Sequence, residues 1–267
     1  MTVPTTRPAV PEAVITAARL RRIGRVAEAA DVVQSTLSNA PADAFDLPFR
    51  DRVLLILTLV DLQLNLAARD KARELLATES AVAGQILAAV RDRGTPDQVH
   101  AASAGFFQLR DRAKQIELLD QPAPSIGSVE WLQGGPESFS DLQGQVVLLE
   151  FWAPWCRSCM AMLPFLNELH DNHGAAGLSV LALASYRSAE DCEPAADREL
   201  IRGAIAENAV DFAVGIAPDD GLRAQYGAHG IPTYALIDRQ GYVRIASSKP
   251  DKSALESAIL RLLESEA

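Results

Sequence analysis

Cysteine is scarce in this sequence, which contains three in 267 residues, Cys156, Cys159 and Cys192. A fold held together by several disulfides needs more cysteines, so this class of protein is excluded. Cys156 and Cys159 lie three positions apart, and such proximity favours a chemical role. Cys192 lies in an acidic stretch and is either a loop thiol without a role or an additional redox partner.

Long apolar runs are also missing. The most apolar stretch, residues 53–60, ends at Asp61 and is far shorter than the roughly 20 residues that span a bilayer. Residues 1–11 lack the apolar core of a secretory signal. We therefore expect no membrane association and a cytoplasmic location, where thiols are kept reduced.

Positive charge is in deficit, with 25 basic against 35 acidic residues and a net charge of −10. The surplus of acid lies entirely in residues 121–267, whereas residues 1–120 are balanced. Because a negative field repels nucleic acid and anionic membranes, neither is expected as a partner.

Residues 1–120 carry apolar side chains at the i, i+3, i+4, i+7 spacing of amphipathic helices, which predicts an all-helical domain. Gly24, Ala29, Val33 and Pro41 resemble the turn glycine, small residue, bulky residue and closing proline of tetratricopeptide-type helical pairs. A plain helical bundle is the alternative. In either case this domain offers a possible docking surface for a protein partner.

After a proline-containing segment at residues 121–127, which we interpret as a linker, strands alternate with helices. A small hairpin is expected over residues 129–139, buried strands over 146–152 and 178–184, a helix over 158–172 and a hairpin over 233–246. This order predicts an α/β domain, residues 121–267, with a mixed central sheet flanked by helices.

The CxxC pair opens the predicted helix that follows the first buried strand. A free cysteine has a pKa of about 8.5, so little of it is thiolate at neutral pH. The unpaired N–H groups at the start of a helix stabilise the anion of Cys156. Cys159, one turn further, can close a disulfide with Cys156, so the spacing favours reversible dithiol–disulfide exchange without a cofactor.

Zinc is the rival interpretation of the pair, because Cys156, Cys159, His170 and His173 follow a zinc-ligand order. The predicted helix continues from Cys159 toward His170, which separates the two residues by roughly 16 Å. Four ligands around one ion cannot span that distance. We therefore expect no metal.

Residues 121–267 resemble the thioredoxin superfamily, and among its members the TlpA/ResA-like thiol–disulfide oxidoreductases most closely. The resemblance is carried by residues 147–156, Val-Leu-Leu-Glu-Phe-Trp-Ala-Pro-Trp-Cys, and by Gly230-Ile231-Pro232-Thr233. It implies that Cys156 attacks a substrate disulfide and that Cys159 resolves the mixed disulfide. It also implies a cis Ile231–Pro232 bond beside the cysteines.

Three further residues take roles from this resemblance. The Ile231 backbone, next to Pro232, would pair with an extended substrate segment, and Trp155 would contact substrate at the surface. Glu150 occupies the place of a buried acid, so its pKa should rise and it could exchange a proton with Cys159. The alternative for Glu150 is an acid at the edge of a strand, hydrogen-bonded to the backbone.

The sequence departs from these relatives in the Arg157-Ser158 dipeptide between the cysteines, which should make the couple more oxidising. The expected substrate is a disulfide in a protein or small molecule, with a thiol as electron donor, and a cytoplasmic location favours the reductase direction. Two alternatives are a redox-switched adaptor whose helical domain docks a partner, and a thiol peroxidase. Peroxidases of this superfamily carry a threonine three residues before the reactive cysteine, where this chain has Ala153.

Overall fold

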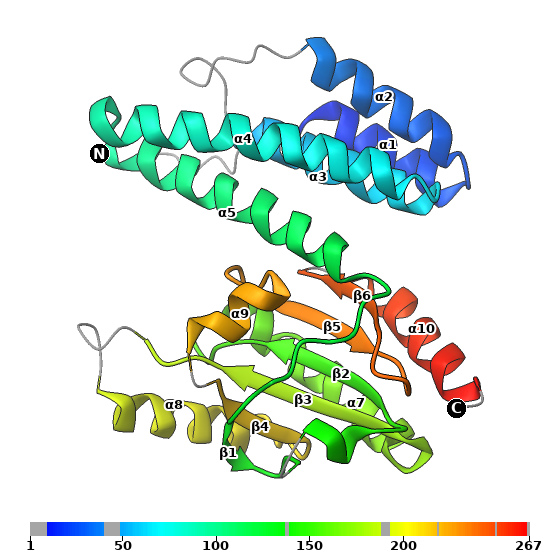
Figure 1. The fold of residues 1–267 in the computed structure, drawn as a ribbon, viewed down its shortest axis with the longest axis vertical. Coiled ribbons are helices and arrows are strands. Elements are labelled where there is room, and N and C mark those ends of the chain that lie inside the picture. Colours follow the sequence, from blue (N-terminus) through cyan, green and yellow to red (C-terminus); the bar gives the residue numbers. More distant parts are fainter. Residues whose placement is uncertain are drawn as a thin grey trace. The chain divides into compact units, whose positions relative to one another are not determined.

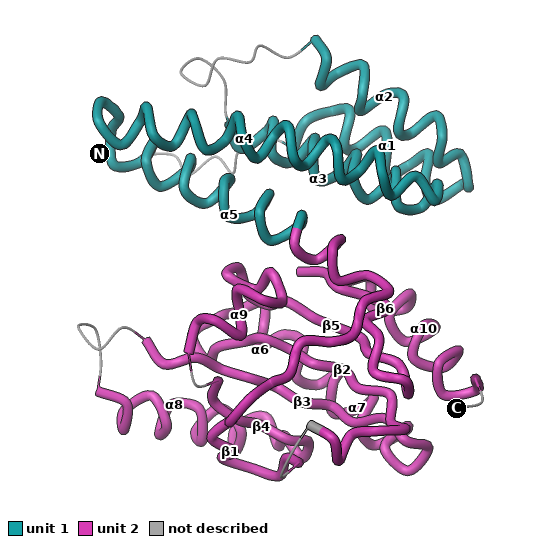
Figure 2. The backbone as a smooth tube through the Cα atoms, in the orientation of Figure 1, with its two compact units in different colours: residues 1–113 teal, residues 114–267 magenta. Residues whose placement is uncertain are grey.

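The structure is a computed structural model that describes residues 10–39, 49–136, 139–187, 193–217, 219–248 and 250–265. The chain forms two compact units, residues 1–113 and 114–267 (Figure 2). This division falls inside a helix, whose last residues belong to the second unit. A domain boundary after residue 120 stays a prediction.

The described part of the first unit is helical, as predicted. Ala29, Val33 and Leu37 are buried along one face of a helix, which shows why the apolar spacing specifies this structure. The Arg52 side chain donates two hydrogen bonds to Glu79, with Nη2 2.7 Å from Oε1 and Nε 3.0 Å from Oε2. The helices are α1 (Glu12–Arg22), α2 (Val26–Asn39), α3 (Phe49–Asn65), α4 (Arg69–Arg93) and α5 (Pro96–Leu118).

A tetratricopeptide-like repeat in this unit stays a prediction. Gly24 lies in the turn between α1 and α2 with a positive φ of 78°, a conformation that favours glycine. Pro41 lies outside the described residues. In the described ranges, the helices lack the combination of length and apolar composition that crossing a bilayer requires.

The second unit contains a mixed sheet with the strand order β1-β4-β3-β2-β5-β6 (Figure 1). Strands β2, β3 and β4 are parallel to one another, whereas β1, β5 and β6 pair in the antiparallel sense. This confirms the predicted α/β class. The strands are β1 (Glu130–Gln133), β2 (Val146–Phe151), β3 (Leu178–Ala184), β4 (Ala213–Ile216), β5 (Thr233–Ile237) and β6 (Val243–Ser247).

Each face of this sheet carries its own apolar cluster. Side chains of α7 (Leu163–His173), α8 (Pro194–Glu207) and α10 (Lys252–Glu264) pack on one face, whereas α9 (Asp220–Tyr226) packs on the other. Residues along β2 alternate between the two faces, as the period of a strand requires. We call the first group the α7-face cluster; it includes Leu148, Trp152, Cys159, Leu163, Leu166, Val180, Ala182, Phe212, Tyr234, Leu236 and Ile259.

Three local predictions are wrong. Residues 129–139 do not form a hairpin, because β1 pairs with β4 and Phe139–Leu142 is a 3-10 helix. The helix expected over residues 158–172 is broken between α6 (Arg157–Met160) and α7, because Pro164 has no N–H to donate to the carbonyl of Met160. The expected linker pairs with the chain at the start of β6, where the Val243 N–H donates to the Gln121 carbonyl at 2.9 Å and the Ala123 N–H donates to the Gly241 carbonyl at 2.8 Å.

Candidate active site

The two cysteines lie directly after the central strand β2. The Trp152 N–H donates to the Leu183 carbonyl at 3.1 Å, which continues the pairing with β3 past the end of β2. A tight turn follows, closed by the hydrogen bond from the Cys156 N–H to the Ala153 carbonyl at 3.0 Å. Cys156 then caps the short helix α6, and Cys159 lies within it.

Cys156 and Cys159 are joined by a disulfide, with their Cα atoms 5.2 Å apart. The Cys159 N–H donates to the Cys156 sulfur at 3.2 Å, and the Ser158 hydroxyl lies 3.4 Å from the same atom. Cys156 is partly exposed, whereas Cys159 is fully buried. One sulfur is therefore partly accessible and accepts a backbone hydrogen bond of the kind that stabilises a thiolate, while the other is buried in the core.

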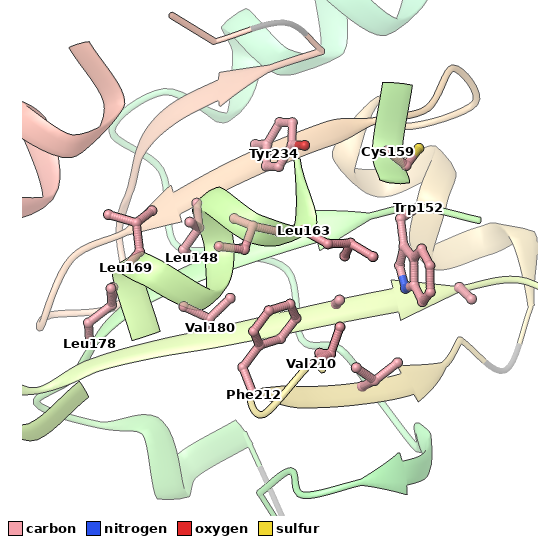
Figure 3. Close-up of a cluster of buried hydrophobic side chains, with 14 of the residues drawn as sticks. Leu148, Trp152, Cys159, Leu163, Leu169, Leu178, Val180, Val210, Phe212 and Tyr234 are labelled. Carbon is pink, nitrogen blue, oxygen red and sulfur yellow. The ribbon is translucent and has the colours of Figure 1, made fainter. Parts of the chain in front are cut away.

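Glu150 lies on β2, and the residues two positions before and after it, Leu148 and Trp152, belong to the α7-face cluster. Cys159 belongs to the same cluster (Figure 3). Glu150 is completely buried in the interior of the sheet, so it is not a strand-edge acid. Burial raises the pKa of Glu150 to about 8, and the hydrogen bond from Tyr234 opposes this rise. At neutral pH a carboxyl in this state is mostly protonated.

The Ile231–Pro232 peptide bond is cis, as the thioredoxin resemblance implies. Pro232 is buried, whereas Ile231 is half-buried and packs against the α7-face cluster, as Cys156 does. The Thr233 hydroxyl donates to the Gly230 carbonyl at 2.7 Å, and the Arg223 guanidinium donates to the carbonyls of residues 228 and 229 at 3.0 and 2.7 Å. These bonds fix the conformation of the loop that carries Ile231.

Trp155 is half exposed, as expected for a surface residue next to Cys156, whereas Trp152 is buried. The Arg187 guanidinium lies over the Trp155 ring, with its carbon 5.1 Å from the ring centre. Arg187 is held by the fully buried Asp197 on α8, through Nε at 2.7 Å and its backbone N–H at 2.8 Å. A cation from the loop after β3 is thereby placed against the site.

Arg187 and Tyr234 are not among the residues predicted from the sequence. A signal for Arg187 exists, because β2 and β3 are parallel and the loops after parallel strands meet at one edge of the sheet. Tyr234 lies opposite Glu150 in the pairing of β2 with β5. That partnership depends on strand register, which the predicted strand limits alone do not specify.

The remaining residues singled out in the sequence are those of the rejected zinc interpretation and Cys192. Across the described ranges, no three His, Cys, Asp or Glu side chains are grouped so that they could hold a metal ion. His170 and His173 are half-buried near the end of α7. Cys192 lies outside the described residues.

Comparison with known proteins places this geometry in a family. The Redoxin family matches residues 119–261. The thiol-disulfide oxidoreductase ResA of Bacillus thuringiensis (strain Al Hakam) is 27% identical over 139 residues, which cover 52% of this chain and 72% of that protein. The thioredoxin-like protein YneN of Bacillus subtilis (strain 168) is 30% identical over 124 residues, which cover 46% of this chain and 68% of YneN.

Among solved structures, a putative thiol:disulfide interchange protein DsbE from Chlorobium tepidum is 32% identical, with a TM-score of 0.43 over 54% of this chain and 99% of that one. The resemblance to the thioredoxin superfamily predicted from the sequence is confirmed by the Redoxin match and the ResA relatives. Residues 119–261 form a thiol–disulfide oxidoreductase domain of the ResA type, and the chain belongs to the Redoxin family.

Proposed function

We propose that this chain reduces disulfides in protein substrates, with Cys156 as the attacking thiol and Cys159 as the resolving thiol. The observation that carries the proposal is the asymmetry of the Cys156–Cys159 disulfide. Its Cys156 sulfur is partly exposed and accepts a hydrogen bond from the Cys159 N–H, whereas Cys159 is fully buried. Attack by the accessible sulfur and resolution by the buried one follow from this difference.

The reaction balances without a cofactor. The Cys156 thiolate attacks one sulfur of the substrate disulfide, forms a mixed disulfide and releases the other sulfur as a thiolate that takes a proton from water. Cys159 loses its proton and attacks the Cys156 sulfur, which releases the second substrate thiolate. Two electrons pass from the dithiol to the substrate, and an external thiol donor then restores the dithiol by the reverse exchange.

Glu150 is the proposed acceptor of the Cys159 proton. A carboxyl whose pKa lies at about 8 is closely matched to a thiol, whose ordinary pKa is about 8.5. Proton transfer between matched groups is nearly balanced in free energy, so it proceeds readily in both directions. The position of Glu150 under the α7-face cluster, which contains Cys159, supports this role.

Trp155, Ile231 and Pro232 are the proposed substrate-binding residues. Trp155 is half exposed next to Cys156. Pro232 has no N–H, and the Ile231 backbone lies just before β5, where an extended substrate segment can pair with it. Hydrogen bonds of this kind recognise the backbone, so they suit protein substrates of varied sequence.

The cytoplasmic location stays a prediction, and the reductase direction depends on it. In a reducing compartment the dithiol form is restored continually, so the protein delivers electrons to substrates. A protein partner for the helical unit also stays a prediction, and the redox-switched adaptor remains the alternative that the following test distinguishes.

The test is insulin reduction with dithiothreitol as donor. We expect the chain to accelerate the reaction, Cys156→Ser to abolish the acceleration, and Cys159→Ser to accumulate a mixed disulfide with insulin, visible on non-reducing gels. Cys192→Ser is the matched control and should retain the rate. Absence of turnover in the unmodified chain would overturn the proposal and favour an adaptor.

A further inference from the structure

We infer that Tyr234 is a positioning residue for the resolving step: its hydroxyl holds one oxygen of Glu150, so that the other oxygen serves Cys159. The inference rests on the proposed function. Tyr234 lies on β5, which begins directly after Pro232. It therefore connects the proposed substrate-binding segment with Glu150, the proposed acceptor of the Cys159 proton.

The contact between the two side chains is short and isolated from water. The Tyr234 hydroxyl donates to Glu150 Oε1 at 2.7 Å, and both residues are buried, with 1% and 0% of their surfaces exposed. They lie directly opposite each other in the antiparallel pairing of β5 with β2. The rigid sheet backbone therefore fixes both ends of the bond.

The second carboxyl oxygen of Glu150 differs from the first in its hydrogen bonding. Oε2 of Glu150 is buried and has no hydrogen-bond partner among the described residues. An unpaired buried oxygen is costly, and it is the oxygen left for proton exchange. The Tyr234 hydroxyl thus anchors Oε1, and Oε2 is left to exchange a proton with Cys159.

The surroundings of Glu150 supply apolar neighbours rather than charges. Ala182 on β3 lies opposite it. Leu148 on β2, Trp152 just after β2, and Cys159 all belong to the α7-face cluster (Figure 3). From α7 and α10 the cluster receives Leu163, Leu166, Leu169, Leu255, Ala258 and Ile259. Burial and the Tyr234 bond are the two influences on its pKa, so the titratable neighbours to consider are Tyr234 and Cys159.

Burial and the Tyr234 hydrogen bond act on the pKa of Glu150 in opposite directions. The Tyr234 bond favours the charged carboxylate and lowers the pKa that burial raises. Loss of the hydroxyl should raise the pKa of Glu150 further, by about one to two pH units. The carboxyl would then stay protonated near pH 8 and could not accept the Cys159 proton.

Tyr234→Phe tests this in the full chain, in a Cys192→Ser background. The reduced protein is mixed with dithiobis(nitrobenzoate) from about pH 6 to about pH 10. The first release of coloured thiolate reports attack by Cys156, and the second reports resolution by Cys159. We expect the pH midpoint of the second phase to rise by about one to two units, while the first phase is unchanged.

Tyr226→Phe is the matched control. Tyr226 is also fully buried, and its hydroxyl donates to the Pro124 carbonyl at 2.6 Å, but it belongs to the cluster on the opposite face of the sheet. Both phases should keep their midpoints in this variant. Glu150→Gln removes the proposed acceptor, so its second phase should be slow below the pH at which the Cys159 thiol ionises by itself.

An unchanged second midpoint in Tyr234→Phe, or equal shifts in both phases, would overturn the inference while the proposed function stands. Absence of a second phase in the parent chain would overturn both. If Tyr234→Phe does not fold, a fluorotyrosine at position 234 keeps the ring and strengthens the donor. The second midpoint should then fall, and an unchanged or raised midpoint would contradict the inference.

Discussion

Glu150 is an unusual residue for its position, because the other residues of β2 are apolar and the whole strand is buried. A buried carboxyl costs free energy unless it is protonated or paired. Glu150 has one hydrogen bond, and its pKa is raised to about 8 mainly by burial. A charged Glu150 at this position therefore lowers stability, which fits the proton exchange that we propose for it.

The raised pKa of Glu150 predicts a loss of stability as pH rises. In the unfolded chain the carboxyl ionises near its ordinary value of 4.5, whereas in the folded chain it holds its proton until about pH 8. The free energy of unfolding should fall between these values and level off above them. At about 1.4 kcal/mol for each pH unit, the total is about 5 kcal/mol.

Glu150→Gln should remove this slope, so the oxidised variant should be more stable than the parent chain near pH 9 and similar below pH 4.5. Urea unfolding followed by tryptophan fluorescence measures it, because Trp131, Trp152 and Trp155 all lie in the second unit. Glu168→Gln, at an exposed acid on α7, is the control. Equal slopes in the parent and Glu150→Gln would contradict the prediction.

At this scale, the sequence predicts what depends on local spacing. The CxxC pair, the exposure of Trp155 and the burial of Glu150 all follow from a strand, a turn and a helix start in succession. The residues that contact Glu150 and Trp155 cannot be predicted from local spacing. Tyr234 meets Glu150 through the register of two strands that lie far apart in the chain, and Arg187 meets Trp155 because β3 neighbours β2.

Among the elements, two of the three wrong predictions share one cause, which is pairing over long distances in the sequence, whereas the break between α6 and α7 is local to Pro164. The sequence predicts that β1 pairs with the segment that follows it, whereas β1 pairs with β4, where Gly215 lies opposite Trp131. A Cβ at Gly215 would collide with Val129 and Trp131, so the close approach of the strands requires glycine there. Periodicity identifies a strand but leaves its neighbour open.

Two helical glycines predict opposite effects of the same substitution. A methyl group at Gly105 in α5 would overlap the ring of the buried Phe49 in α3, whereas one at Gly203 in α8 would meet nothing within 4 Å. Gly105→Ala should destabilise the first unit by about 1–2 kcal/mol, since overpacking outweighs helix propensity. Gly203→Ala should stabilise the second unit by about 0.5–1 kcal/mol.

Amide hydrogen exchange measures both changes in peptides from α3, α5 and α8. Faster exchange in α3 and α5 of Gly105→Ala, with α8 unchanged, is the expected result. Each glycine variant is the control for the other, because both add one methyl group to a helix. Slower exchange in α3 and α5 of Gly105→Ala would show that Phe49 moves aside without cost.

For the whole molecule, composition and pattern predict a helical part followed by an α/β part, and both are confirmed. Where one part ends is harder to predict, because α5 continues from the first unit into the second. Leu118 is buried in the cluster on the α9 face, and the Asp120 N–H donates to the Val243 carbonyl at 2.8 Å. Pro122 and Pro124 indicate where a helix must have ended, but they do not show that the core of the second unit already includes residues before them.

Two fragments test whether the α/β unit begins within α5 or after residue 120. Residues 114–267 retain Leu118, Asp120 and Gln115, whose amide donates to the Gly227 carbonyl at 2.8 Å, whereas residues 121–267 lose all three. We expect the shorter fragment to be less stable to urea by about 2–5 kcal/mol, the range for loss of a large buried side chain, and Leu118→Ala in the longer fragment to reproduce much of the difference. Equal unfolding free energies would place the functional boundary at residue 120, and the end of α5 would then belong to the helical unit alone.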